Sequence, residues 1–207
     1  MRIKLIYLLF FLSGVAGLIY EIVWSRLLVL IFGSTTQSMV AVVSAYMMGL
    51  GGGSLIIGRI ADKLTGKQLV KLYVLLEAGV GITGIATLGL VPVIKSTYSL
   101  VSNGDGVTWS LLMVKFLLAE MILVLPALLM GGTLPVLTRW VREQNIALEK
   151  GLSQLYAVNT LGAVVGVLMA ALVMIEILGL TNTILVAGLI NLSVAWRASL
   201  MTKNENK

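Results

Sequence analysis

Long apolar segments separated by short loops account for nearly the whole of this chain. One apolar run begins at Leu5 and continues to Phe32, interrupted only by Glu21 and Arg26, and five further runs follow it. A run of about 20 apolar residues can cross the hydrocarbon core of a bilayer as a helix, in which every backbone hydrogen bond is satisfied internally. The sequence therefore predicts an all-α integral membrane protein with six transmembrane helices.

The predicted helices are bounded by glycine, proline or charged residues. They cover about residues 5–32, 37–60, 69–94, 109–130, 152–178 and 183–200, in one domain over residues 1–201, with a polar cytoplasmic tail at 202–207. Lys95 to Ser110 is predicted to be a polar loop, and Pro126 and Pro135 to mark a kinked exit from the fourth helix. Residues 140–150 are predicted to form an amphipathic connector, and Gly179 to open a tight turn.

The amino-acid composition argues against a soluble domain and excludes several kinds of catalytic and metal site. The chain is 58% hydrophobic and 12% charged, whereas a typical soluble domain is about 25% charged. It contains no cysteine and no histidine, which removes thiol nucleophiles, imidazole bases, zinc sites and histidine-ligated haem. No cluster of carboxylates is evident, so neither a metal nor a cofactor is predicted.

The basic residues are distributed unevenly among the loops. Of the 15 Lys and Arg residues, only Lys95 lies in a predicted outer loop, and Arg26 and Lys115 lie within spans. The other 12 lie on the predicted inner side: Arg2, Lys4, Arg59, Lys63, Lys67, Lys71, Arg139, Arg142, Lys150, Arg197, Lys203 and Lys207. This asymmetry predicts that both termini lie on the cytoplasmic side of a plasma (bacterial inner) membrane. The net charge of +6 therefore comes from basic loops beside the lipid bilayer, and no nucleic-acid partner is predicted.

Charges inside the predicted spans are the main functional signal. Three helices followed by three of opposite orientation suit an inverted repeat, and the first and fourth each carry an opposite-charge pair, Glu21/Arg26 and Lys115/Glu120. Each such charge costs about 2.5–3.5 kcal/mol at a helix centre, so it normally faces a partner or a wet cavity. Two interpretations stay open. One is an ion-pair network that fixes helix register, and the other makes Glu21, Glu120 and Glu77 counter-charges for a cationic substrate or a proton.

Two pairs of glycines have the spacing that allows helices to approach closely. Gly49 and Gly53 lie in the second predicted helix, and Gly162 and Gly166 in the fifth. Small residues four positions apart let two membrane helices bring their backbones together. We expect ordinary helix packing at these positions, with a dimer or gating surface as the alternative.

The loop after the second predicted helix combines glycine with acidic and basic residues. They are Gly58, Arg59, Asp62, Lys63, Gly66 and Lys67. Glycine permits a tight turn, and Asp62 is suited to capping a helix end and holding nearby cations. The loop resembles the signature Gly-x-x-x-Asp-Arg/Lys-x-Gly-Arg/Lys of the major facilitator superfamily, with one extra residue between Lys63 and Gly66. That resemblance implies a role in alternation between transport states, and the alternative is a plain basic cytoplasmic loop.

A second resemblance covers almost the whole chain. Residues 17–27 (GLIYEIVWSRL), 129–135 (LMGGTLP) and 155–163 (LYAVNTLGA) are similar to the membrane half of the membrane-fused spermidine synthase-like proteins. In that family a facilitator-like bundle precedes a cytoplasmic aminopropyltransferase-like domain. This sequence stops after the sixth predicted helix, so the resemblance implies a half-facilitator bundle without the catalytic domain, and no enzyme activity is expected.

Two functions are consistent with these features. The first is one half of a facilitator-type transporter for polyamines or another small cation, acting as a homodimer or with a partner subunit. The second is a non-transporting scaffold or accessory subunit. It would dock a cytoplasmic synthase-like enzyme or a larger membrane complex through the basic loops and the 139–150 connector.

Overall fold

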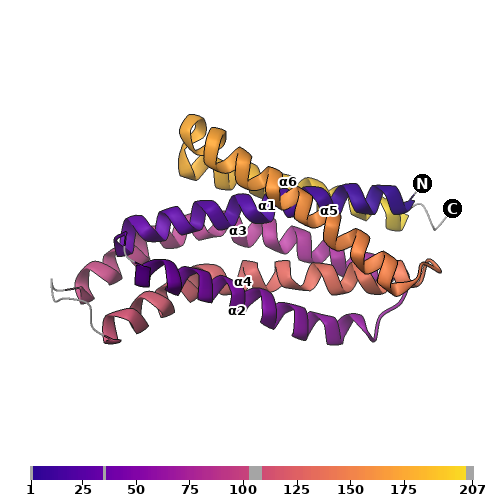
Figure 1. The fold of residues 1–207 in the computed structure, drawn as a ribbon, viewed down its shortest axis with the longest axis horizontal. Helices are drawn as coiled ribbons and strands as arrows, with labels where there is room; N and C mark the ends of the chain where they lie inside the picture. Colours follow the sequence, from indigo (N-terminus) through magenta and orange to yellow (C-terminus); the bar gives the residue numbers. More distant parts are fainter. Residues whose placement is uncertain (1, 35, 103–108, 204–207) are drawn as a thin grey trace.

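The computed structural model describes residues 2–34, 36–102 and 109–203, which form a bundle of long helices (Figure 1). Both ends of the chain lie at the same end of the bundle. Within the described residues every regular element is helical. In order they are α1 (Arg2–Phe32), α2 (Thr36–Ala61), α3 (Lys67–Val101), α4 (Trp109–Arg142), α5 (Leu148–Met169), the π-helical segment η1 (Ala170–Met174) and α6 (Ile175–Lys203).

Five helical stretches of the described chain are long and apolar enough to cross a membrane. They are Ile3–Phe32, Thr36–Ala61, Lys67–Val101, Trp109–Arg142 and Leu148–Thr202. The last has 55 residues, although one crossing needs only about 20. Within it Gly179 has a non-helical backbone, with φ 76° and ψ 170°. Figure 1 shows the ribbon turning back in this region, so that α5 and α6 run in opposite directions.

Several predicted boundaries are wrong because the helices continue further than expected. Helix α3 extends to Val101, so most of the predicted loop that begins at Lys95 is helical or lies at residues 103–108, outside the described residues. Helix α4 continues through Pro126 and Pro135 to Arg142. Unpaired backbone groups are costly in an apolar medium, which favours continuing a helix past a proline over ending it there.

The predicted connector and tail are also shorter than expected. Residues 140–142 belong to α4, residues 143–147 form a turn, and α5 begins at Leu148. Asn145 in this turn has a φ of 57°. The predicted polar tail begins inside α6, which reaches Lys203, and residues 204–207 lie outside the described residues.

The helices pack as two equivalent sets of three. Helix α2 lies against α4 and α1 against α5, while α3 and α6 pack against each other. Helix α3 also contacts α4, and α6 contacts α1. If α1, α2 and α3 are exchanged with α4, α5 and α6, and η1 is counted as part of α5, the same pairs of helices are in contact. Because α1 and α4 run in opposite directions (Figure 1), the fold is an inverted repeat.

Close backbone approach fixes the register of this repeat. A Cβ atom on Gly53 of α2 would collide with the backbone of Leu128 in α4, and one on Gly166 of α5 would collide with the backbone of Val15 in α1. The same shift of 113 residues relates several positions: Gly49 to Gly162, Gly53 to Gly166, Val15 to Leu128, and Gly66 to Gly179. The predicted glycine pairs therefore lie inside the chain's own two equivalent helix contacts.

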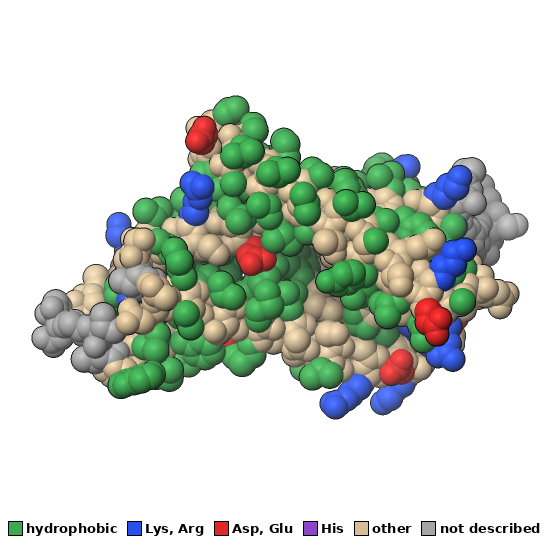
Figure 2. All heavy atoms as spheres, in the orientation of Figure 1, with side chains coloured by type: hydrophobic (Ala, Val, Ile, Leu, Met, Phe, Trp, Pro, Cys, Tyr) green, Lys and Arg blue, Asp and Glu red, His purple; other side chains and the backbone are tan. Residues whose placement is uncertain are grey.

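The interior consists of two apolar clusters, one toward each end of the bundle. Tyr20 and Val80 belong to one cluster, and Tyr73 and Leu76 to the other. Figure 2 shows hydrophobic side chains over the middle of the visible face, with most of the Lys and Arg side chains gathered at the end where the termini lie. Glu77 is both charged and buried. It lies in the sequence between Leu76 of one cluster and Val80 of the other, at the junction of the two clusters.

The repeat register predicts which glycines tolerate a methyl group. We expect Gly53→Ala and Gly166→Ala each to lower the free energy of unfolding by about 1–3 kcal/mol, because the added Cβ forces two backbones apart. Gly52→Ala is the matched control, since a Cβ there meets nothing within 4 Å and alanine favours a helix. Thermal denaturation of the purified protein in detergent measures the difference. Equal melting temperatures for the three variants would contradict the assigned register.

Candidate functional site

A group of polar side chains is buried where α1, α3 and α6 meet. Tyr73 and Glu77 lie one turn apart on α3, so they project from the same face. Glu77 has none of its surface exposed and Asn191 of α6 has 1%. The Asn191 side-chain amide donates a hydrogen bond from Nδ2 to Glu77 Oε2 over 2.6 Å. Ser13 of α1 also lies beside the carboxylate.

Four polar atoms in this group have no hydrogen-bond partner among the described residues. They are Glu77 Oε1, Asn191 Oδ1 and the hydroxyl oxygens of Tyr20 and Tyr73. The Tyr73 hydroxyl lies close to the Glu77 carboxylate but not in hydrogen-bonding geometry. An unsatisfied buried polar group costs about 1–3 kcal/mol, so four in one place are an unusual concentration. These oxygens are of the kind that hold a proton or a small cation. We refer to Ser13, Tyr20, Tyr73, Glu77 and Asn191 as the Glu77 cluster.

Aromatic packing and small residues position Tyr20 in this cluster. Its ring stacks on Trp24, with 4.8 Å between the ring centroids, and Trp24 Nε1 donates to Thr87 Oγ1 of α3 over 3.1 Å. Gly84 of α3 is required beside it, because a Cβ there would lie 2.5 Å from the tyrosine ring. Tyr20 is thereby held between α1 and α3, with its hydroxyl on the side of the buried Glu77 carboxylate.

Lys115 does not join the ion-pair cluster proposed from the sequence. Its side chain is buried, Nζ donates to Ser38 Oγ of α2 over 3.1 Å, and it lies 5.9 Å from the centroid of the Tyr98 ring. Residues five apart on a helix point about 140° away from each other at 3.6 residues per turn. Lys115 and Glu120 therefore face different neighbours, and the same geometry separates Glu21 from Arg26.

The remaining span charges occupy separate places. Glu21 is half-buried in a narrow space beside Tyr46 and Leu123. Glu120 is half-buried, and its Oε1 has no hydrogen-bond partner among the described residues. Arg26 is exposed at a groove described below. Within the part of the chain that the structure describes, no ion pair at 4.0 Å or less joins these charges to one another or to Lys115. The repeat register also makes Arg26 equivalent to Arg139, so the two charge pairs are not counterparts.

The loop motif is held by an acid that the sequence did not single out. Gly66 has a φ of 49° and immediately precedes α3, and its N–H donates to Glu143 Oε2 over 2.7 Å. A carboxylate at a helix N-terminus is favourable because unpaired N–H groups and the helix dipole point toward it. Asp62, predicted to cap a helix end, is exposed. In the sequence Glu143 directly follows Arg142 at the end of α4, and this position does not mark it as a partner of Gly66.

The other residues of the loop motif lie around the turn between α2 and α3. Gly58 is in the last turn of α2, where its carbonyl accepts the Asp62 N–H over 3.0 Å. Arg59 and Lys63 are exposed, and Lys67 begins α3. Among the described residues no three acidic side chains gather in the way that a metal site requires.

Comparison with protein-family models, with curated proteins and with solved structures gives no match for this chain.

The Glu77–Asn191 bond makes a prediction about stability. Asn191→Leu should lower the free energy of unfolding by about 1–3 kcal/mol or more, because it removes the donor to a fully buried carboxylate. The double variant Glu77→Leu/Asn191→Leu should recover most of this loss, since neither polar group then remains. Thermal denaturation of the four forms in detergent completes a double-mutant cycle. Additive losses would mean that the two side chains act independently.

Proposed function

We propose that this chain is a membrane transporter subunit in which the Glu77 cluster binds a proton or a small cation between two inverted repeats. The observation that carries the proposal is the Asn191–Glu77 hydrogen bond. It joins α3 of the first repeat to α6 of the second, at the junction of the two apolar clusters. Many transporters place substrate and ion sites at the interface of inverted repeats near the middle of the membrane.

The proposed membrane topology has six crossings with both termini in the cytoplasm. The repeat supports six crossings, because Gly179 occupies the position in the second repeat that Gly66 occupies between α2 and α3. The turns at residues 62–66 and 143–147 lie at the end of the bundle that carries the termini (Figure 1). Most basic loop residues belong to this end, which supports a cytoplasmic location.

The substrate class that we propose is a polyamine or another small cation. Glu77 and Glu120 each have a buried carboxylate oxygen without a hydrogen-bond partner in the described structure. Lys115 is engaged with Ser38 instead, which leaves these carboxylates available as counter-charges. A six-helix bundle corresponds to half of a twelve-helix facilitator, so we propose that the subunit works as a homodimer or with a partner subunit. It has no enzymatic role in this proposal.

A non-transporting scaffold is the second candidate. The Glu143–Gly66 contact favours it, because this contact ties two basic cytoplasmic turns into one surface suited to docking an acidic protein. The two functions differ in their dependence on the buried acids. A scaffold tolerates neutral replacements at Glu77 and Glu120, whereas a cation transporter does not.

Cysteine labelling tests the topology directly, because the chain contains no cysteine. We expect Lys63→Cys and Gln144→Cys to react with a membrane-impermeant maleimide from the cytoplasmic side only. Lys95→Cys should react from the opposite side. Right-side-out and inverted vesicles give the comparison. Reaction of positions 63 and 144 from opposite sides would refute the six-crossing arrangement.

Uptake of radiolabelled spermidine into proteoliposomes tests the function. We expect saturable uptake by the wild type and at least a tenfold loss in Glu77→Gln, because the neutral amide keeps the shape of the side chain and removes its charge. Glu176→Gln is the matched control, since Glu176 is exposed. Glu21→Gln and Glu120→Gln show whether the half-buried acids contribute. If the wild type transports no small cation although the purified protein is monodisperse and unfolds cooperatively on heating, the result would favour the scaffold.

A further inference from the structure

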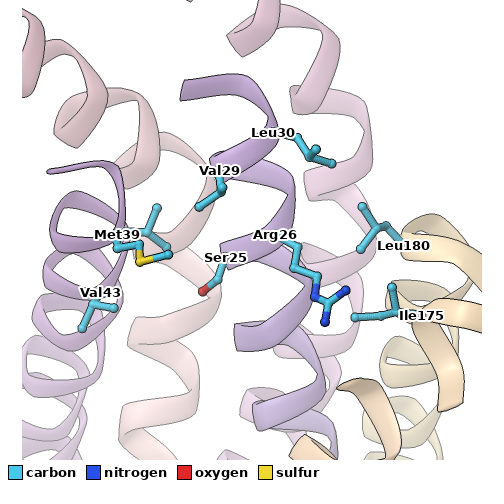
Figure 3. Close-up of a pocket in the computed structure, with 9 residues that line it drawn as sticks. Ser25, Arg26, Val29, Leu30, Met39, Val43, Ile175 and Leu180 are labelled. Carbon is cyan, nitrogen blue, oxygen red and sulfur yellow. The ribbon is translucent and has the colours of Figure 1, made fainter. Parts of the chain in front are cut away.

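An apolar groove lies between α1, α2 and the start of α6, beside the backbone break at Gly179. Its volume is about 590 Å³, within the range of about 300–1,000 Å³ that ligand pockets typically have. Figure 3 shows α1 as its floor, with side chains from α2 on one side and from the start of α6 on the other. The residues used in the argument below are Arg26, Leu30, Met39, Val43, Ile175 and Leu180.

Of the described residues that line this groove, Arg26 is the one that carries a charge. Figure 3 shows its guanidinium extending from α1 toward Ile175, over an otherwise apolar wall. Among the described residues no carboxylate lies within 4.0 Å of it. An arginine within a membrane span costs about 2.5–3.5 kcal/mol or more near the centre unless it reaches an anion or water.

The depth of Arg26 indicates which anion is within reach. It lies six residues before Phe32, where α1 ends, which places it about 9 Å along the axis from that end at 1.5 Å per residue. Figure 3 shows the guanidinium extending across the groove toward Ile175, with its methylene groups among apolar neighbours, so an anion that enters the groove from the nearby headgroup layer meets it. Phospholipid phosphates lie in that layer, and a guanidinium binds phosphate through two parallel hydrogen bonds.

We propose that a membrane phospholipid occupies this groove, with its phosphate on Arg26 and an acyl chain along the apolar walls. Val29, Met39 and Val43 line one side of the groove, and Leu30, Ile175 and Leu180 line the other (Figure 3). Ser25 also lines the groove, on the side of α2 (Figure 3). Charge complementarity selects this occupant, because a lipid supplies an anion and a hydrocarbon chain in one molecule. The proposal does not depend on whether the chain transports anything.

Quantification of co-purified phospholipid tests the site. The wild type, purified in mild detergent, should retain phospholipid that native mass spectrometry detects as a stoichiometric adduct. Arg26→Gln should lose it, with at least a tenfold weaker affinity for added dioleoylphosphatidylglycerol. Arg26→Lys should retain part of the binding as a point charge. Arg142→Gln is the matched control, because Arg142 is an exposed cation at the other end of the bundle.

A second variant separates the groove from the charge alone. Val43→Trp fills the apolar wall and leaves Arg26 in place, so it should also displace the lipid while the protein stays monodisperse on gel filtration. An unchanged adduct in both Arg26→Gln and Val43→Trp would overturn the proposal. Oxidative cross-linking of Leu180→Cys between two chains in a bilayer would overturn it too, since a second copy would then cover the groove.

Discussion

Close contact between helix backbones is the constraint on which this structure depends. In lipid the usual hydrophobic drive between helices is weak, so helices associate through van der Waals packing at small residues. Gly53 lets α2 reach the backbone of α4, and Gly166 lets α5 reach the backbone of α1. These two contacts tie each repeat to the first helix of the other. The remaining helices, α3 and α6, then meet each other in the interior.

That arrangement determines where a polar site is able to form. Helices α3 and α6 are both partly enclosed by other helices, so a polar residue at their contact is shielded from lipid. Glu77 and Asn191 lie there and hydrogen bond to each other. The two residues come from different repeats, so a relative movement of the repeats would change the surroundings of the carboxylate. In the function that we propose, this dependence would link proton or cation binding to a conformational change.

The sequence predicted the helices better than it predicted the contacts between their charges. Apolar runs located the helical segments, and glycine spacing identified positions that the structure places at helix contacts. Helix ends were less predictable, as at α3 and α4, because an apolar medium lets a helix continue through residues that end one in water. The proposed ion-pair cluster failed for a geometric reason. Residues five apart on one helix cannot face the same partner, so Lys115 contacts Ser38 while Glu120 points elsewhere.

The candidate site could be predicted only in part for a related reason. A carboxylate inside a span is visible in the sequence, but its partners come from helices whose relative register is set by packing. Asn191 lies 114 residues from Glu77, and neither its type nor its position marks it as a partner. Likewise Glu143 acquires a role only because the turn after α4 lies beside Gly66.

The repeat is symmetric in its backbone contacts but not in its chemistry. By the register that relates Gly53 to Gly166, Glu77 corresponds to Ile190 and Asn191 to Ala78. Each repeat therefore contributes one polar residue to the shared contact and an apolar residue at the equivalent place. A second carboxylate at position 190 would place two like charges together in an apolar interior, where their repulsion is strong. A single carboxylate with a neutral amide partner avoids that repulsion, and in the function that we propose it is the group that binds one cation. A site of this kind needs both repeats, and the backbone contacts at the glycines are what bring the two together.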